Sequence, residues 1–249
     1  RFSGTDTKII VGEDSNWTEE PAVPTLNDAS AAQYLDIVGS HNYNNSNYPP
    51  FSTARSRNKK VWQTEVSNLG DNDSSMTDGM RWARQIHDFL TSAEGNSWCY
   101  WWTICYKVNP AKGEALININ TTNNTWFTNK RLYTMGNFSK FVRPGWYRLA
   151  TSTASSNGVH VSAFKHTATD EFAIVAINEN GSTQTRSFSI SGYSVSSVVP
   201  HVTSSSSNLA ASNPIPVSGG TFSATLPANS VTTFTSTGTT PGGDTGDAN

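Results

Sequence analysis

The sequence predicts parallel β/α units over residues 1–143 and an antiparallel β-sandwich over residues 144–236. Short apolar runs alternate with helical patterns in the first part, which is typical of parallel β/α units. After Pro144-Gly145, Val and Phe alternate with Ser and Thr at a period of two, between turns rich in Gly, Asn and Ser. Residues 237–249 are rich in Gly, Thr, Pro and Asp, which indicates a flexible linker.

Helical patterns separate the four predicted strands of the first part. The strands are Lys8–Val11, Leu35–Gly39, Lys60–Val66 and Trp98–Tyr106. A short helix is predicted near Asp28–Tyr34, where Asn27 or Asp28 could cap its start. The predicted helix Thr77–Ala93 carries apolar residues at helical spacing, and Thr128–Val142 forms the last helix before Pro144.

Six strands are predicted in the second part: Val159–Lys165, Glu171–Asn178, Thr185–Ser191, Ser197–His201, Gly220–Leu226 and Ser230–Ser236. Few acidic and few aromatic residues occur there. We therefore expect this part to have a structural role.

Polar and aromatic residues gather at the carboxyl ends of the four strands of the first part. They are Glu13, His41, Tyr43, Glu65, Trp101 and Trp102. In a β/α barrel the carboxyl ends of the strands face the active site. Any single one of these residues could lie in an ordinary surface loop, but the coincidence at all four strands indicates a site. Glu65 is the residue predicted to carry chemistry.

The composition favours a secreted protein. The formal net charge of −2 offers no basic patch for nucleic acid or for a membrane surface, and no apolar run reaches the ~18 residues of a spanning helix. Asn, Ser, Thr and Gly are abundant, and they form seven candidate N-glycosylation sequons, at Asn16, Asn44, Asn72, Asn120, Asn123, Asn137 and Asn180.

Cysteine and histidine suggest no redox or metal chemistry. Within one strand, Cys99 and Cys105 would lie roughly 20 Å apart, too far for a disulfide, so we expect buried free thiols or partners of cysteines outside this chain, and less readily a catalytic thiol. The five histidines lack metal-ligand spacing, and neither a phosphate-binding loop nor a dinucleotide fingerprint is present. The sequence therefore predicts no metal and no cofactor.

Three segments resemble glycoside hydrolase family 30. They are VWQTEVS around Glu65, YWWTI on the following strand, and KRLYTMGNFSKFVRPGWYRL over Lys130–Leu149; SHNY at residues 40–43 is similar to a further segment of the family. The resemblance extends from about Lys8 to Thr235 and is greatest to the xylan-cleaving branches. It implies that residues 1–143 form the C-terminal half of a (β/α)8 TIM barrel, with the β-sandwich as its side domain.

The resemblance implies retaining hydrolysis by two carboxylates, with Glu65 as the nucleophile that forms a glycosyl-enzyme. His41 and Tyr43 match positions beside the nucleophile, and Tyr43 could hydrogen-bond the Glu65 carboxylate and keep it ionised. Trp101 or Trp102 would form the floor on which a sugar ring stacks. The alternative for these two tryptophans is core packing.

The chain departs from the family pattern in two respects. The family's acid/base glutamate follows the fourth barrel strand in an Asn-Glu pair, whereas the Asn178-Glu179 pair here lies in the predicted sandwich. We therefore expect a fragment, or one half of a two-part enzyme whose partner is the N-terminal half of the barrel. Glu13 is expected to bind substrate or support the site, and less readily to replace the missing glutamate in proton transfer. In addition, Cys105-Tyr106-Lys107 replaces an Arg-rich segment that grips glucuronic acid branches in bacterial glucuronoxylanases, so strict glucuronate dependence is in doubt.

The leading hypothesis is a secreted, retaining β-1,4-xylanase that acts on glucuronoxylan or arabinoxylan, with a polysaccharide as its binding partner. An endo-β-1,6-galactanase or a β-glucosidase-like member of the same family is the alternative within the class. A non-catalytic carbohydrate-binding or structural fragment is the alternative from another class.

Overall fold

The computed structural model describes residues 6–44, 47–68, 73–106, 114–152, 155–192 and 195–236. The chain divides into two compact units: residues 1–72 with 88–126, and residues 73–87 with 127–248. The predicted linker at 237–249 lies outside the described residues.

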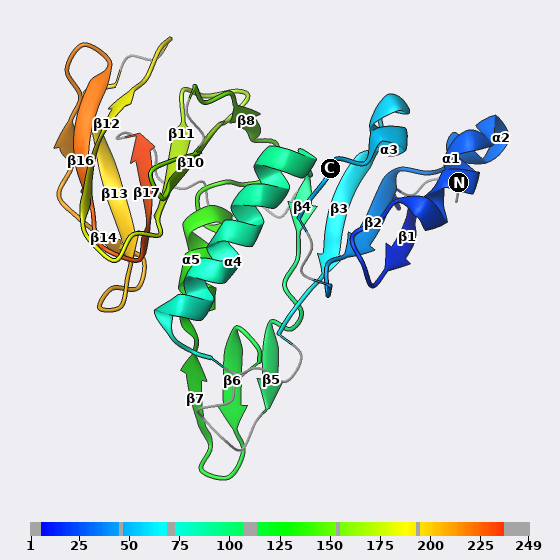
Figure 1. The fold of residues 1–249 in the computed structure, drawn as a ribbon, viewed down its shortest axis with the longest axis horizontal. Coiled ribbons are helices and arrows are strands. Elements are labelled where there is room, and N and C mark those ends of the chain that lie inside the picture. Colours follow the sequence, from blue (N-terminus) through cyan, green and yellow to red (C-terminus); the bar gives the residue numbers. More distant parts are fainter. Residues whose placement is uncertain are drawn as a thin grey trace. The chain divides into compact units, whose positions relative to one another are not determined.

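A four-stranded parallel sheet forms the centre of the first unit. Its order is β1 (Ile10–Asp14), β2 (Ile37–His41), β3 (Lys60–Glu65) and β4 (Ser97–Trp98) (Figure 1). All three pairings are parallel, so the predicted β/α units of the first part are confirmed. Within the described part of the chain, β1 and β4 are the two edges of this sheet.

Short helices connect these strands. They are η1 (Glu20–Ala22), α1 (Val23–Asn27), α2 (Ala29–Ala32) and α3 (Ser52–Ser56). The Asp28 side chain caps α2 by accepting hydrogen bonds from the backbone N–H groups of Ser30 and Ala31, as predicted for that helix. The Glu19 carboxylate caps α3 in the same way, accepting from the backbone N–H groups of Thr53 and Ala54 at 2.9 Å each.

Aromatic side chains dominate the core of the first unit. Trp17 stacks on Phe51 with ring centroids 4.3 Å apart, and Tyr48 and Phe89 meet the indole edge-on. Phe89 begins a π-helical turn, η2 (Phe89–Ala93), that follows α4 (Met76–Asp88). Together with Val38 and Val61 from the sheet, these rings hold the β/α connections against the strands.

The prediction of one strand over Trp98–Tyr106 is wrong. β4 ends at Trp98, and β5 (Ile104–Tyr106) belongs to a separate sheet with β6 (Ile117–Asn120) and β7 (Thr125–Thr128). The apolar residues of this run are not all buried: Ile104 and Tyr106 are 56% and 75% exposed. The reason is that the chain leaves the parallel sheet after Trp98. Cys99 and Cys105 form no disulfide with each other; Cys105 is buried as predicted, whereas Cys99 is only partly buried.

Two antiparallel sheets form most of the second unit. The larger follows the path β14-β13-β17-β11-β10-β8, and the smaller pairs β12 with β16. The strands are β8 (Tyr147–Leu149), β9 (Ser155–Ser156), β10 (Val159–Lys165), β11 (Phe172–Asn178), β12 (Gln184–Ser189), β13 (Ser197–Thr203), β14 (Ala210–Ala211), β15 (Ile215–Pro216), β16 (Thr221–Leu226) and β17 (Ser230–Ser236). Each of the six strands predicted from the alternating pattern is present.

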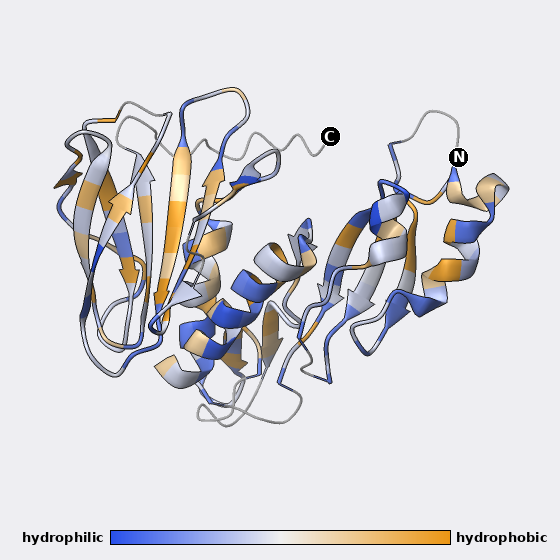
Figure 2. Cartoon of the chain, turned by 45° about the horizontal axis from the view of Figure 1, so that its top comes forward, coloured by the Kyte–Doolittle hydropathy of each residue, from blue (hydrophilic) through white to orange (hydrophobic). Residues whose placement is uncertain are grey.

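A single apolar core lies between these two sheets. Phe188 and Phe222 on the smaller sheet stack with centroids 4.9 Å apart, and Phe234 on β17 meets both from the larger sheet. Figure 2 shows the corresponding hydrophobic segments along the antiparallel strands. Alternate residues of β16 are buried and exposed, as the period-two pattern requires.

Two helices belong to this second unit rather than to the first part, to which they were assigned. Most of α4 and α5 (Lys130–Ser139) lies on the sandwich side of the division. The reason is specific bonding: the Asn137 amide donates to the His201 carbonyl and to Thr233 Oγ1, and Arg131 forms a buried ion pair with Asp78 at 2.7 Å. The structural division therefore differs from the predicted boundary at residue 143.

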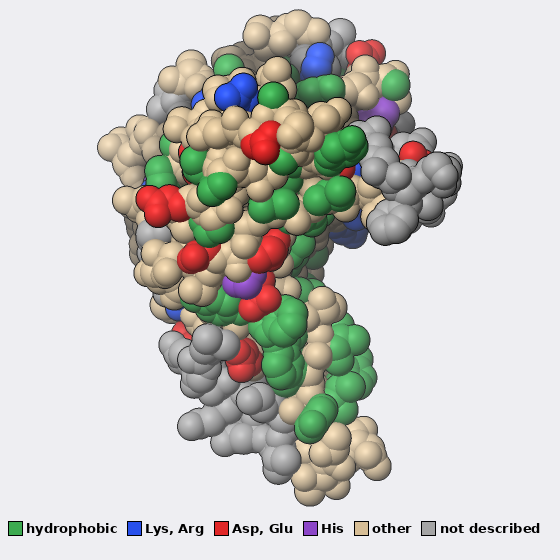
Figure 3. Space-filling model, turned by 90° about the vertical axis from the view of Figure 1, so that its right-hand side faces the viewer, with side chains coloured by type: hydrophobic (Ala, Val, Ile, Leu, Met, Phe, Trp, Pro, Cys, Tyr) green, Lys and Arg blue, Asp and Glu red, His purple; other side chains and the backbone are tan. Residues whose placement is uncertain are grey.

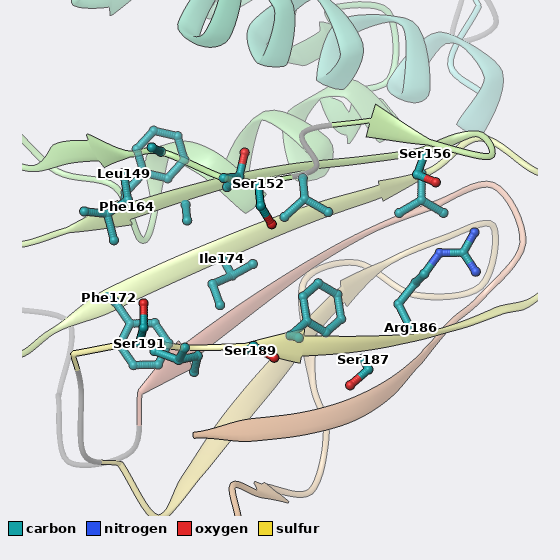
Figure 4. A pocket seen from close by; sticks show the side chains of 17 residues that line it. Leu149, Ser152, Ser156, Phe164, Phe172, Ile174, Arg186, Ser187, Ser189 and Ser191 are labelled. Atoms are coloured by element: carbon teal, nitrogen blue, oxygen red, sulfur yellow. The ribbon is translucent and has the colours of Figure 1, made fainter. Parts of the chain in front are cut away.

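A cavity of about 490 Å³ opens between the two antiparallel sheets, on the side where β12 lies opposite β8 and β10 (Figure 4). Apolar side chains such as Phe164, Phe172 and Ile174 line one wall, whereas Ser187, Ser189 and Arg186 come from β12. Close packing of the core therefore ends before this edge.

Candidate active site

Glu65 is the last residue of β3 and lies at the carboxyl end of the parallel sheet. Its side chain is 27% exposed, so the carboxylate is accessible but partly shielded from water. The register between β2 and β3 pairs Ser40 with Gln63 and then His41 with Glu65, which leaves Thr64 as an extra residue. This bulge brings Glu65 opposite His41.

Tyr43 holds one oxygen of the Glu65 carboxylate. The phenol donates a hydrogen bond to Glu65 Oε1 at 2.8 Å. Burial, and then the hydrogen bond and the charge of Glu65, raise the pKa of Tyr43 well above its ordinary value, while a hydrogen bond with Ser67 acts in the opposite direction. The phenol therefore stays protonated and remains a donor to the carboxylate.

His41 lies between two carboxylates. Its Nε2 is 3.2 Å from Glu13 Oε2 and 3.8 Å from Glu65 Oε2. Only the first distance is that of a hydrogen bond. Figure 3 shows a histidine among acidic side chains on an open face of the molecule, with hydrophobic side chains beside them.

One residue of the site, Glu114, was not predicted from the sequence. It is buried, and its Oε1 accepts a hydrogen bond from Ser67 at 3.1 Å. The Tyr100 hydroxyl donates to the Glu114 carbonyl at 2.7 Å, and the charge of Glu114 contributes to the raised pKa of Tyr43. Glu114 precedes β6 in a stretch without strand or helix periodicity, so no sequence pattern links it to Tyr43.

The two tryptophans after β4 are exposed, 44% for Trp101 and 40% for Trp102. The Trp101 backbone N–H donates to the Val66 carbonyl at 2.9 Å, which ties the segment to the residue after Glu65. The two rings meet edge-on, with centroids 6.0 Å apart. Their exposure argues against the alternative of core packing and leaves apolar faces free for contact.

The described residues contain no group of three or more His, Cys, Asp or Glu side chains placed to hold a metal ion. Among the same residues, no helix is long and apolar enough to cross a membrane. His160, by contrast, belongs to a network of the second unit with Ser155, Glu179 and Arg84.

The Asn178-Glu179 pair lies in the second unit, as predicted. Asn178 is buried at the end of β11, where its amide donates to the carbonyls of Leu226 and Pro227. Glu179 Oε2 lies 2.9 Å from His160 Nε2. This pair is therefore part of a structural network within the second unit.

The predicted glycosylation positions differ in exposure. Asn16, Asn44 and Asn123 are exposed, whereas Asn120 is buried and Asn72 lies outside the described residues. A glycan on Asn137 is incompatible with this structure, because the amide nitrogen is buried and donates two hydrogen bonds. The Asn180 amide likewise donates to Asn157 and Asn178, so a glycan there would displace one of these bonds.

A carboxylate that accepts from a tyrosine at the carboxyl end of a parallel sheet, with exposed tryptophans nearby, is an arrangement typical of glycoside hydrolases built on β/α units. No protein-family model matches the chain. It is 34% identical to glucuronoxylanase XynC of Bacillus subtilis (strain 168), over 92% of this chain and 52% of that protein.

Solved structures of xylanases are similar to the chain as well. The subfamily 8 xylanase Xyn30A from Clostridium acetobutylicum superimposes with a TM-score of 0.79 at 35% identity, over 92% of this chain and 55% of that one. The catalytic domain of xylanase C from Talaromyces cellulolyticus gives a TM-score of 0.78 at 30% identity, over 94% and 53%. Over more than nine-tenths of its length the chain is therefore similar to xylanases of glycoside hydrolase family 30. It spans about half the length of the curated relatives that it matches.

Proposed function

We propose that this chain is the nucleophile-bearing part of a secreted, retaining xylanase that cleaves β-1,4-xylan. The observation that carries the proposal is the Glu65 carboxylate, held through Oε1 by Tyr43 and accompanied by the exposed Trp101 and Trp102. The family relatives support the substrate class, since they are named as a glucuronoxylanase and as xylanases.

In this mechanism Glu65 attacks the anomeric carbon of a xylose unit through Oε2, the oxygen to which Tyr43 does not donate. The attack forms a glycosyl-enzyme ester, and water later cleaves it with retention of configuration. Tyr43 stabilises the negative charge on Glu65 before attack and again when the carboxylate leaves. A tryptophan face suits the apolar C–H face of the sugar and would orient the ring for attack.

The second carboxylate, which protonates the leaving oxygen and activates water, comes in this proposal from outside these 249 residues. The parallel sheet has two edge strands, β1 and β4, among the described residues, as half of an eight-stranded barrel would have. We propose that an N-terminal half-barrel pairs with these edges and supplies the acid/base residue. The antiparallel sheets then form the side domain.

Strict dependence on glucuronic acid branches is not expected. At the positions where bacterial glucuronoxylanases carry an Arg-rich segment, Cys105 is buried and Tyr106 is 75% exposed, while Lys107 lies outside the described residues. Neither Cys nor Tyr provides the bidentate donor pair that a carboxylate branch would bind. Arabinoxylan and unbranched xylan are therefore proposed substrates together with glucuronoxylan.

A chimera tests the proposal. This chain would replace the corresponding half of the Bacillus subtilis glucuronoxylanase, and reducing-sugar release would be measured on arabinoxylan, glucuronoxylan and β-1,6-galactan. We expect turnover on the xylans, its loss in Glu65→Gln with xylan binding retained, and normal activity in the control Glu20→Gln, because Glu20 is exposed and outside the site. Activity surviving Glu65→Gln would refute the nucleophile assignment. Cleavage of the galactan alone would favour the galactanase alternative, and xylan binding without any turnover would favour a non-catalytic fragment.

The accessibility of the glycosylation sequons is tested separately. Expression of the chain in a eukaryotic secretory host would place glycans on exposed sequons such as Asn16 and Asn123, which endoglycosidase treatment and mass spectrometry would reveal. A glycan found on Asn137 would contradict the burial of that side chain.

A further inference from the structure

Glu13 occupies an unusual place at the end of β1. The pairing of β1 with β2 matches Gly12 to Gly39 and then Asp14 to Ser40, so Glu13 is the extra residue of a bulge. Its backbone is left-handed, with φ +58°, a conformation that non-glycine residues rarely adopt. The bulge redirects the Glu13 side chain across β2.

Two glycines make room for this arrangement. Gly12 has φ +120°, and a Cβ there would collide with the Gly39 carbonyl. A Cβ at Gly39 would collide with the Glu13 carboxylate itself. The carboxylate therefore lies over the bare backbone of β2, a space that a side chain at position 39 would fill.

Across β2, the Glu13 carboxylate meets the second bulge of the sheet. Thr64, the extra residue of β3, donates a hydrogen bond to Glu13 Oε2 at 2.8 Å. The same oxygen lies 3.2 Å from His41 Nε2. The extra residues of two bulges on strands that flank β2 are thus joined through one carboxylate oxygen, which also holds the imidazole.

Two carboxylates lie near His41 Nε2, and the distances show which of them accepts its hydrogen bond. A carboxylate only accepts, so the contact with Glu13 requires hydrogen on Nε2. This N–H donates to Glu13 Oε2, because the 3.8 Å distance from Nε2 to Glu65 Oε2 is beyond hydrogen-bonding range. Glu65 therefore receives a hydrogen bond from Tyr43 on Oε1, while His41 leaves Oε2 available.

We propose that Glu13 is a positioning residue of the active site: it holds the His41 N–H away from Glu65 Oε2 and so keeps that oxygen free to attack the sugar. The inference rests on the proposed role of Glu65 as nucleophile. The sequence left substrate binding and support of the site open for Glu13; this proposal specifies the second, since Glu13 acts through His41 and makes no required contact with the sugar.

The first test uses this chain alone and needs no turnover. Long-range ¹H–¹⁵N NMR at about pH 8 would report the protonated nitrogen of His41. We expect Nε2 to carry the proton in the unmodified chain and in Glu13→Gln, whose amide oxygen still accepts its hydrogen bond. In Glu13→Ala the Nε2 proton loses this acceptor, and the His41 signals should change. The matched control Glu20→Ala should leave the His41 signals unchanged. His41 signals unaffected by Glu13→Ala would overturn the proposal.

The second test separates three roles for Glu13 by kinetics in the chimera. Loss of one hydrogen bond to a charged group predicts a kcat about 10- to 100-fold lower in Glu13→Ala, with KM little changed and most of the rate restored in Glu13→Gln. Equal inactivity of the Ala and Gln variants would assign proton transfer to Glu13 and overturn the proposal. A rise in KM with kcat unchanged would assign substrate binding and overturn it as well.

Gly39→Ala provides an independent variant. The added methyl group would displace the Glu13 carboxylate, which is the flexible end of a side chain, without removing it. We expect a loss of kcat similar to that of Glu13→Ala, and unchanged kcat in a folded Gly39→Ala chimera would contradict the inference. If Glu65→Gln left the chimera active, the proposed function would fail while the His41 measurement on the isolated chain could still succeed, so the two failures are distinguishable.

Discussion

Tyr43→Phe is the most direct probe of how the site prepares its nucleophile. The substitution keeps the ring and removes only the hydroxyl that donates to Glu65 Oε1 at 2.8 Å. Hydrogen bonds to charged groups contribute about 1.5–3 kcal/mol. Because the Glu65 side chain is 27% exposed, water replaces part of the lost bond, and the lower end of this range applies. A loss of about 1.5–2 kcal/mol corresponds to a rate about 10- to 30-fold lower.

The assay is xylan hydrolysis by the chimera, with kcat and KM measured separately. We expect the loss in kcat, since Tyr43 contacts the nucleophile and stabilises its charge. Tyr48→Phe is the matched control: it removes the hydroxyl of another tyrosine of the first unit, which accepts from the Trp98 indole instead of donating to Glu65. A kcat within twofold of the unmodified chimera, or an equal loss in Tyr48→Phe, would refute the reasoning.

Three further predictions concern the second unit. Arg131→Met leaves the buried carboxylate of Asp78 without its 2.7 Å partner and should lower the free energy of unfolding by about 3–5 kcal/mol in urea titrations, whereas Arg131→Met combined with Asp78→Leu should recover most of the loss. Burial, only partly offset by Arg131, raises the pKa of Asp78 to about 6, above its unfolded value of about 3.9. Between these two pH values the folded state therefore binds more protons than the unfolded state. The contribution of Asp78 to stability is fully present below about pH 4 and is lost as pH rises through about 6. Asp78→Asn should abolish this dependence of the free energy of unfolding on pH, measured by denaturation at several pH values. Phe234→Ala removes a ring packed on two others and should lower the free energy of unfolding by about 3–5 kcal/mol, more than Ile174→Val, whose side chain already borders the cavity.

The prediction of the antiparallel strands from sequence succeeded for a simple physical reason. Alternate residues of a strand face opposite sides, so one buried face leaves a period-two pattern in the letters themselves. Val159–Lys165 and Ser230–Ser236 were predicted with the bounds that the structure has. The same reasoning failed at Trp98–Tyr106, because consecutive apolar residues do not tell a buried strand from an exposed aromatic loop followed by a strand of another sheet.

The helices show a second limit of the sequence. The apolar stripe of α4 and the pattern of α5 were visible, yet neither specifies which sheet will cover the stripe. That choice depends on bonds between residues far apart in the chain, such as Asn137 with Thr233 and Arg131 with Asp78. Thr233 becomes a neighbour of Asn137 only when β17 has formed, and Asp78 becomes a neighbour of Arg131 only when α4 and α5 pack together.

The sequence alone predicted that Glu65 lies at the end of a strand of a parallel sheet and that His41, Tyr43 and two tryptophans lie at or after the ends of neighbouring strands, because parallel strands bring their carboxyl ends to one edge. Only the tertiary structure decided which of these groups are joined by hydrogen bonds. The bulges at Glu13 and Thr64 shift the register by one residue, the space above Gly39 admits a carboxylate, and the buried Glu114 reaches Ser67 from a distant segment. Each of these features depends on distances of a few ångströms between strands, which no spacing along the chain encodes.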